Sequence, residues 1–565
     1  MTRYGSDVVV DLLRDVGDEH VAFNPGATFR GIHDSLAHSA SGPEIMLCTH
    51  ESISVAIAQG YAKTAGAPMA VLLHDVVGLQ SAAMAIYNAW CDRTPILCLG
   101  GTGPMSKPRR RPWIDWVHTA LVQGQQVRDY VKWDDQPADL ASVPESFARA
   151  WATTRSAPPG PVYLCLDVTI QEDEAPPGFD HGSPGEYPLP TPPGASAGDV
   201  ATLAGWLREA QLPVLVTDYA GDTETGFASL RELAELLHAP VIDLGARFNF
   251  PVEHELNLTG QEAELADADV VVFLDAEDPA GRFAQSPWST GNPHVVNVSP
   301  AHLRLRSWAQ DYQPLLRAGD HLSASCEAIL PDLVQALRQQ PPSPERLTAR
   351  HRRLTGLRAA RLARWRTEAV AADDASTIPP ARLAAELAPL LEGERWMLAH
   401  GTLDGWEKRL WPFERHRQHI GWHGGGGLGY GAGAAIGAGL ALDRETLCLS
   451  IQPDGDLLYT PSALWTAARY GVPVLFLMHN NRQYRNTVDH ASRVGAERGR
   501  GDDRRYAGAG LDGPAVDFGA LARSFGVWAD GPVSRPADIA AAFEAARAVV
   551  RSGRPALVDI LTTGS

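Results

Sequence analysis

Two short polar stretches, PDGD at 453–456 and NN at 480–481, contain side chains that could together hold a metal ion. Each stretch follows a short apolar run, and a helical pattern closed by a glycine lies between them. A strand, a helix and a strand of these lengths predict a βαβ unit, in which the carboxyl ends of two parallel strands meet at one edge of the sheet. Asp454 and Asn481 should therefore lie side by side there. With a backbone carbonyl such as that of Gln483, they would form an oxygen site of the kind that Mg2+ prefers.

Each of these polar stretches, taken by itself, also has a simpler explanation as a loop former at the end of a strand. The same holds for Glu51, which follows a short apolar run and precedes a helical pattern that continues through residues 60–62. A single glutamate at the start of a helix usually interacts with the helix dipole. The combination of the two polar stretches at this spacing favours a functional site. Glu51 becomes a catalytic candidate through the family resemblance described below.

Two histidines are candidates for proton transfer. His74 ends the apolar run at 69–73, and His118 lies in the segment Trp-Val-His-Thr at 116–119. An imidazole can exchange protons near neutral pH and can also bind a carboxylate. Each of the two can equally be a structural histidine with satisfied hydrogen bonds.

A glycine-rich run at 424–431 allows the backbone to approach a ligand closely. The run resembles a dinucleotide-binding fingerprint, but an isolated run of this kind is weak evidence, and no acidic residue follows at the spacing that a ribose partner requires. A nucleotide-dependent dehydrogenase is therefore disfavoured.

The elements that must position these residues alternate between strand and helix patterns, which predicts an α/β fold with three doubly wound parallel-sheet domains. We place the domains at 1–170, 197–338 and 377–565. A linker rich in Pro, Gly and acidic residues spans 171–196. A second linker at 339–376 is rich in Arg and Ala and is expected to be a solvated connecting helix rather than a nucleic-acid element.

The composition of the 565 residues is that of an ordinary globular protein, with 44% hydrophobic and 21% charged residues. A formal charge of −18 argues against nonspecific binding of nucleic acid. The six cysteines are scattered and form no CxxC pair, which is typical of a reducing compartment. The N-terminal stretch lacks a signal-peptide pattern, and no apolar run is long enough to cross a membrane. We expect a soluble protein in the cytoplasm.

The segment from 454 to 481 resembles the thiamine diphosphate (ThDP) motif, in which Gly-Asp-Gly is followed after roughly two dozen residues by Asn-Asn. The order of the three domains, over nearly the whole chain, is similar to that of ThDP-dependent 2-oxo-acid decarboxylases and acetohydroxyacid synthases, especially their benzoylformate decarboxylase and acetolactate synthase branches. The resemblance implies a pyrimidine-binding domain, a middle domain and a diphosphate-binding domain, in that order.

The resemblance also implies roles for individual residues. In the family, a buried glutamate (Glu51 here) bonds the aminopyrimidine ring of the cofactor and promotes its basic tautomer. The glycine-rich run supplies a carbonyl, that of Gly426, to the amino group of the same ring, and Leu428 holds the cofactor in a bent shape. The implied metal ligands are Asp454, Asn481 and the carbonyl of Gln483, and the further cofactor-binding residues are Gly401, Thr402 and Gly455.

The candidate substrate site is only partly similar to that of the family. His74 resembles the active-site histidine of benzoylformate decarboxylase, and His118 falls where pyruvate decarboxylases have a pair of histidines. The loop NPGAT at 24–28 resembles the corresponding loop of benzoylformate decarboxylase, although Ala27 stands where that enzyme has Ser. The expected substrate contacts are Pro25, Gly26, Ala27 and Thr28.

The metal motif departs from the family at two positions, since Pro453 replaces a Gly and Asp456 replaces a common Ser. A carboxylate next to a diphosphate is electrostatically unfavourable, so Asp456 should either point away or accept a hydrogen bond from a backbone N–H. These departures would suit a ThDP-fold binding or regulatory subunit without turnover. The presence of Glu51, Asp454 and Asn481 together argues against that alternative.

The expected activity is therefore that of a ThDP- and Mg2+-dependent lyase or transferase that acts on a 2-oxo acid. It would decarboxylate this acid and/or join the product to an aldehyde or a second 2-oxo acid, which gives a 2-hydroxy ketone as acetolactate synthases do. The alternative is a non-oxidative aromatic or branched 2-oxo-acid decarboxylase that releases an aldehyde. The family further implies a homodimer or homotetramer with sites at the subunit interface. FAD is disfavoured, because the middle domain has no convincing glycine-rich nucleotide loop.

Overall fold

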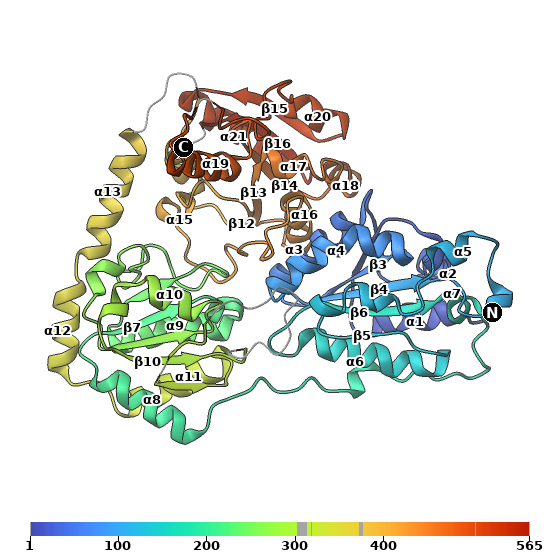
Figure 1. The fold of residues 1–565 in the computed structure, drawn as a ribbon, viewed down its shortest axis with the longest axis horizontal. Helices are drawn as coiled ribbons and strands as arrows, with labels where there is room; N and C mark the ends of the chain where they lie inside the picture. Colours follow the sequence, from blue (N-terminus) through green and yellow to red (C-terminus); the bar gives the residue numbers. More distant parts are fainter. Residues whose placement is uncertain (1, 302–313, 318, 372–376, 503, 564–565) are drawn as a thin grey trace.

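The computed structural model describes residues 2–301, 314–317, 319–371, 377–502 and 504–563, which form three parallel β-sheets with helices packed around them (Figure 1). The strand orders are β2-β1-β3-β4-β6-β5, β11-β10-β9-β7-β8 and β12-β13-β14-β16-β15. Among the described residues, the ladders between neighbouring strands of these sheets are parallel, for example β13 with β14 and β3 with β4. The predicted fold class of three parallel-sheet α/β domains is confirmed.

The first sheet is built from residues 20–167. Its strands are β1 (His20–Phe23), β2 (Glu44–Leu47), β3 (Met69–Leu73), β4 (Ile96–Thr102), β5 (Asp134–Asp135) and β6 (Val162–Asp167). Its helices are α1 (Gly5–Asp15), α2 (Arg30–His38), α3 (Glu51–Ala65), α4 (Asp75–Cys91), α5 (Ile114–His118), α6 (Val143–Arg155) and α7 (Val168–Glu172). Neighbouring strand residues such as Val71 and Leu72 belong to different buried clusters, because successive side chains point to opposite faces of a sheet.

The second and third sheets follow the same plan. The second contains β7 (Pro213–Thr217), β8 (Val241–Asp243), β9 (Val270–Leu274), β10 (His294–Val298) and β11 (Asp320–Leu322), with α8 (Ala197–Glu209), α9 (Glu224–Leu237), α10 (Pro279–Gln285) and α11 (Cys326–Gln339). The third contains β12 (Trp396–His400), β13 (Leu447–Pro453), β14 (Val474–Asn480), β15 (Trp528–Val533) and β16 (Ala556–Leu561). Its helices are α14 (Pro380–Leu387), α15 (Glu407–Leu410), α16 (Gly431–Ala441), α17 (Asp454–Leu457), α18 (Ala463–Tyr470), α19 (Arg485–Glu497), α20 (Phe518–Ser524) and α21 (Pro536–Arg551).

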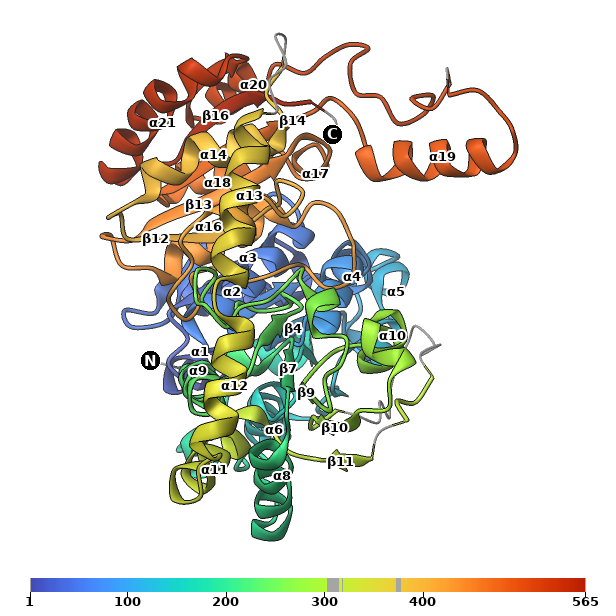
Figure 2. The ribbon, with the colours of Figure 1, turned by 90° about the vertical axis from the view of Figure 1, so that its left-hand side faces the viewer.

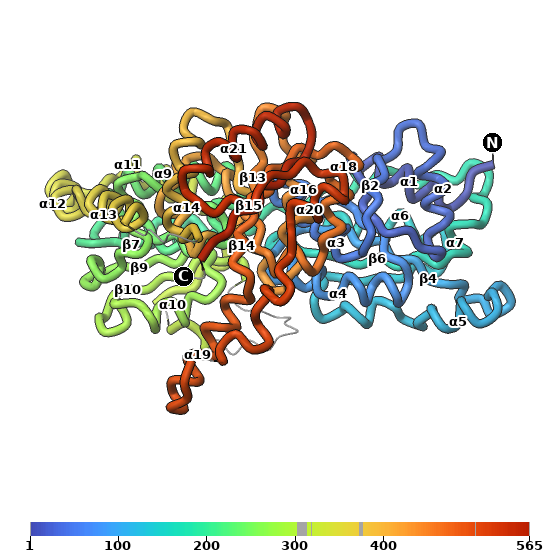
Figure 3. The backbone as a smooth tube through the Cα atoms, turned by 90° about the horizontal axis from the view of Figure 1, so that it is seen from above, coloured from blue at the N-terminus to red at the C-terminus, as the bar shows by residue number. Residues whose placement is uncertain are grey.

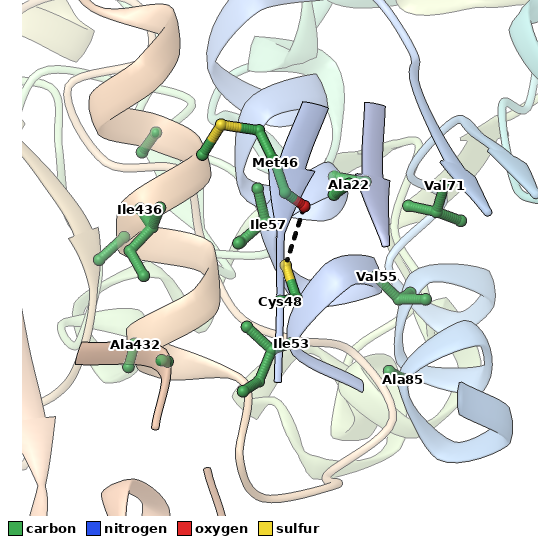
Figure 4. Packing of buried hydrophobic residues seen from close by; sticks show 14 of the residues in the cluster. Ala22, Met46, Cys48, Ile53, Val55, Ile57, Val71, Ala85, Ala432 and Ile436 are labelled. Atoms are coloured by element: carbon green, nitrogen blue, oxygen red, sulfur yellow. Dashed lines mark hydrogen bonds between the residues drawn. The ribbon is translucent and has the colours of Figure 1, made fainter. Parts of the chain in front are cut away.

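The first and third domains share one hydrophobic core, because α3 packs directly against α16 (Figure 4). Ile57 of α3 and Ile436 of α16 are fully buried in it. The helices approach closely through glycines: a Cβ atom on Gly437 would lie 1.9 Å from the carbonyl oxygen of Ile57, and one on Gly60 would lie 2.0 Å from that of Ala434. The contact therefore tolerates no larger side chain at these positions.

The second linker differs from the single solvated helix that we expected. It forms two helices, α12 (Pro344–Leu354) and α13 (Leu357–Ala371), which are separated at Gly356 with φ +83° (Figures 1 and 2). Arg350 is 1% exposed and donates to three main-chain carbonyls of the middle domain at 2.5–3.1 Å. Arg358 is 3% exposed and donates to the carbonyl of Val252. Most other residues of the two helices are exposed, so the connection is helical and largely solvated as expected, but these two buried arginines hold it on the middle domain.

Helix α19 extends away from the body of the third domain, as Figures 2 and 3 show. Antiparallel pairing of Gln483 with Gly510 joins the two ends of this extension. In the part of the chain that the structure describes, no helix combines the length and the apolar character needed to span a membrane.

Because α3 and α16 are in close contact, a single methyl group added between them should lower the stability of the protein strongly. Gly437→Ala should destabilise the joint core by about 2–3 kcal/mol, because its Cβ would overlap a backbone oxygen rather than a movable side chain. Urea unfolding followed by tryptophan fluorescence measures this loss. Gly205→Ala in α8 is the matched control, since its Cβ would meet nothing within 4 Å, and it should be neutral or stabilising by up to about 1 kcal/mol. Equal midpoints for the two variants would contradict a tight contact.

Candidate active site

A cavity of about 740 Å3 lies at the carboxyl ends of β12, β13 and β14. It is the place where an open parallel sheet usually binds a ligand. Its walls come from the loops that follow these three strands. They include all the third-domain residues that we predicted from the sequence: Gly401, Thr402, Gly426, Leu428, Asp454, Gly455, Asn481 and Gln483.

Asp454 and the Asn481 loop lie in contact, as the predicted βαβ unit requires. Asp454 follows the last residue of β13, is 3% exposed, and accepts from the backbone N–H of Arg482 at 2.5 Å. The side-chain oxygen of Asn481 accepts from the N–H of Gln483 at 3.1 Å. Burial raises the pKa of Asp454 to about 6. The three residues offer a carboxylate, an amide oxygen and a main-chain carbonyl, a donor set that suits a hard cation such as Mg2+.

The carboxylate of Asp456, which would be unfavourable if it faced a diphosphate, has hydrogen-bond partners within the protein. Its carboxylate accepts from the N–H of Gly429 at 2.8 Å, from the N–H of Gly431 at 3.0 Å, and from the amide of Gln452 at 2.8 Å. The expectation that Asp456 binds a backbone N–H is confirmed. The side chain ties the glycine-rich run to the metal motif, and two backbone dipoles and an amide offset its charge.

The glycines at the cavity are required by backbone conformation. Gly401 has φ +117°, and a Cβ there would lie 2.1 Å from the carbonyl oxygen of Ile451 in β13. Gly426 has φ +76° and faces open space. Only glycine adopts such conformations without strain. Leu428 is 40% exposed, so a large apolar side chain is available at the rim of the cavity.

Two buried histidines of the cavity wall, His400 and His479, were missed by the sequence analysis. Their Nδ1 atoms are buried and have no hydrogen-bond partner among the described residues. Burial lowers the pKa of both imidazoles to about 4, so both are neutral at pH 7. Each histidine lies at the carboxyl end of a strand, as His74 does: His400 is the last residue of β12 and His479 the last but one of β14. That position was the only signal that could have identified them.

The predicted residues of the first domain form a second cluster. Glu51 is the first residue of α3, is 5% exposed, and accepts from the side-chain amide of Asn24 at 3.1 Å. Thr28 Oγ1 lies 2.9 Å from Nδ1 of His74. A Cβ on Gly26 would lie 2.3 Å from that of His74, so the loop at 24–28 touches this histidine directly, while Pro25 and Ala27 are exposed beside it.

Asp75 joins His74 and His118, and the sequence analysis did not single it out. Its Oδ2 atom lies 3.5 Å from Nε2 of His74 and 3.5 Å from Nδ1 of His118, and the two rings are 5.7 Å apart. Asp75 is fully buried, and burial raises its pKa while lowering that of His74. In the sequence, Asp75 looks like an ordinary acidic residue at the start of a helix, because nothing places position 118 beside it.

The two clusters do not meet within one chain. None of the described residues that line the 740 Å3 cavity belongs to the first domain. The glycine-rich run does contact the first domain, since Asn88 of α4 exchanges two hydrogen bonds of 3.0 Å with the backbone of Gly427. The chain thus brings together the third-domain residues in one place and Glu51, His74 and His118 in another.

The chain matches two families of domains, which together cover half of its length. Residues 3–123 match "Thiamine pyrophosphate enzyme, N-terminal TPP binding domain", and residues 399–560 match "Thiamine pyrophosphate enzyme, C-terminal TPP binding domain". Thiamine pyrophosphate is another name for thiamine diphosphate. Both halves of the predicted cofactor site lie within these matches.

Individual proteins are similar over the full length. A benzoylformate decarboxylase of Pseudomonas aeruginosa is 27% identical over 98% of this chain and 97% of its own. The acetolactate synthase isozyme 3 large subunit of Escherichia coli is 24% identical over 99% of this chain and 95% of its own. The structure of a thiamine diphosphate-dependent 4-hydroxybenzoylformate decarboxylase from Rhodococcus jostii has the same fold, with a TM-score of 0.78, 23% identity and 99% of both chains covered.

The hydrogen bonds of Asp456 predict that this residue supports the glycine-rich run. Asp456→Ala would leave the N–H groups of Gly429 and Gly431 without their acceptor, so we expect a loss of about 2–3 kcal/mol in the free energy of unfolding and weaker cofactor binding. Urea unfolding and calorimetric titration with ThDP and Mg2+ measure the two effects. Asp456→Asn is the control that keeps one oxygen acceptor, and it should lose clearly less. An alanine variant that matches the wild type in both measurements would contradict this role.

Proposed function

Because the chain belongs to the thiamine pyrophosphate enzyme family, we propose that it uses ThDP and Mg2+ to decarboxylate a 2-oxo acid. The observation that carries the proposal is the Asp75 carboxylate, which lies 3.5 Å from both His74 and His118 and so links two proton carriers beside the loop at 24–28. Two relatives over the full length are a benzoylformate decarboxylase and an acetolactate synthase subunit.

The residues of the 740 Å3 cavity fit the cofactor. Asp454, Asn481 and the carbonyl of Gln483 would hold Mg2+. The loop at Gly401 and Thr402 offers N–H and hydroxyl groups to phosphate oxygens, and its glycine leaves no side chain in the way. Asp456 does not oppose this assignment, because its carboxylate accepts three hydrogen bonds from the protein.

Each cluster then has a defined task. When bound, ThDP supplies an electron sink that lets CO2 leave a 2-oxo acid. Glu51, held by Asn24, would bind the aminopyrimidine ring, and Leu428 would fill the space beneath the cofactor. His74 and His118 would hold and deliver protons at the substrate, and the buried Asp75 would stabilise whichever imidazole is protonated.

Proton delivery by this histidine pair favours release of an aldehyde. Carboligation is the second candidate, since the similarity to an acetolactate synthase subunit extends over 99% of this chain. In that reaction the acceptor would be an aldehyde or a second 2-oxo acid, and the product would be a 2-hydroxy ketone.

We also propose that the complete site lies between two copies of the chain, in a homodimer or homotetramer. The cavity lining comes from the third domain alone, whereas Glu51 and the histidines belong to the first. Large apolar side chains are exposed next to His118, with Trp113 and Trp116 at 63% and Leu121 at 77%. Exposed aromatic side chains of this size are typical of a surface that a partner covers.

Product analysis tests the activity. The protein with ThDP and Mg2+ should release CO2 and an aldehyde from at least one of pyruvate, benzoylformate and longer 2-oxo acids.

Glu51→Gln should lower this rate by about 100-fold or more, because the variant cannot take part in proton transfer. Glu224→Gln, the same change at the first residue of α9, is the matched control and should leave the rate unchanged. A 2-hydroxy ketone as the main product with an aldehyde present would favour carboligation, and no CO2 from any acid would contradict both functions.

A site shared between two chains predicts complementation. Glu51→Gln and Asp454→Ala should each be inactive alone. After co-expression, about half of the dimers are hybrids with one intact site, so the mixture should recover about a quarter of the wild-type activity. Two differently tagged copies of Glu51→Gln, co-expressed in the same way, serve as the control and should stay inactive. A mixture as inactive as its components would place the whole site within one chain.

A further inference from the structure

A second cavity, of about 320 Å3, lies where the middle domain, the second linker and the third domain meet. Its wall consists of the loop that follows β8, one face of α13, and the region of α15. The third-domain side of this seam lies within the C-terminal family match, but the proposed reaction gives its lining no role. We call it the seam cavity.

The seam cavity is strongly cationic. The positive side chains that line it are Arg247, Arg358, Arg361, Lys408 and Arg409, and its carboxylate is that of Asp243. Two of these charges have partners of their own. Arg247 pairs with Asp92 at 2.6 Å and with Asp222 at 2.7 Å. Asp243 accepts from backbone N–H groups and from the amide of Asn249.

The arginines of α13 have donors that the protein leaves unused. Arg358 is 3% exposed and gives two of its nitrogens to the neutral carbonyl of Val252, while its third, Nη1, is buried with no hydrogen-bond partner among the described residues. Nε of Arg361 is in the same situation. Burial lowers the pKa of Arg358 to about 10. A buried cation that faces a neutral acceptor is costly, and an anion in the cavity would offset that cost.

The cavity also has flat apolar walls beside these charges. The guanidinium groups of Arg361, Arg358 and Arg409 lie 4.8, 5.2 and 5.8 Å from the centre of the Trp365 ring, which is 6% exposed. Phe248 and Phe413 form another part of the lining. Cations held over aromatic faces are positioned to bind an anion next to a planar group.

We propose that the seam cavity binds a small organic anion, with a phosphate or carboxylate group on the unused arginine donors and a flat apolar body against the aromatic wall. The volume matches a ligand of modest size. Gly405, Lys408 and His419 line both this cavity and the 740 Å3 cavity. An anion bound in the seam therefore contacts the same segment that carries Gly401 and Thr402, which makes it a candidate effector of the neighbouring site.

Calorimetric titration of the full-length protein tests this binding, with phenyl phosphate, benzoate and inorganic phosphate as separate probes. At least one of the two aromatic anions should bind saturably, at one per chain, and more tightly than inorganic phosphate. The first two probes distinguish a phosphate from a carboxylate ligand. Arg361→Ala should weaken the binding about tenfold, the effect of losing one charged hydrogen bond. Arg409→Ala provides a second variant with the same expectation.

The matched control is Arg364→Ala, on the same helix, because this side chain is 57% exposed and pairs with Glu368 instead of lining the cavity. It should bind the probe as the wild type does. The titration is repeated with ThDP and Mg2+ at saturation, and the probe should still bind saturably at one per chain, with an affinity shifted by the coupling between two cavities that share three lining residues. Absence of saturable binding, unchanged affinity in both variants, or displacement of the probe by ThDP would each overturn the proposal. The readout is binding, so it is independent of whether the proposed reaction occurs.

Discussion

The contact between α3 and α16 fixes, within one chain, the positions of Glu51 and of the glycine-rich run, which would contribute to two different sites of the proposed dimer. Glu51 is the first residue of α3, and the glycine-rich run leads directly into the first turn of α16. The glycines of each helix contact the backbone of the other, so there is no room for an additional methyl group at Gly60 or Gly437. Such a close contact fixes the position of one helix relative to the other, because tightly packed interiors resist small displacements. The hydrophobic core that joins the two domains is thus also what sets the geometry of their ligand-binding loops.

Buried charge is the second constraint, and the protein answers it in two ways. Asp456 is satisfied by main-chain and amide groups, and Arg350 and Arg358 of the linker donate to main-chain carbonyls, which offset a charge without adding an opposite one. Asp75 instead faces two histidines that can each carry a proton. The first arrangement is structural, since it connects loops and linkers to their neighbours. In the second arrangement, Asp75 can stabilise a proton on either histidine, which is the property that proton transfer requires.

Much of this protein follows from local patterns. The alternation of apolar runs with helical segments predicted three parallel sheets, and the strand–helix–strand spacing placed Asp454 beside Asn481. Both inferences succeed because strand period and the parallel direction of a βαβ unit are local properties. The charge of Asp456 also led to a correct expectation, since a carboxylate in that place needs donors wherever the chain folds.

Other features depend on contacts between residues that are far apart in the sequence. The sequence by itself determined the fold class and the pairing of Asp454 with Asn481, because both rest on residue type and short spacing, whereas Glu51, His74 and His118 became candidates through the resemblance to a family. Only the tertiary structure decided that Asp75 joins His74 to His118, and that Arg350 and Arg358 of the linker are buried rather than solvated. The partner of a buried charge is chosen by packing between domains, and no local pattern records it.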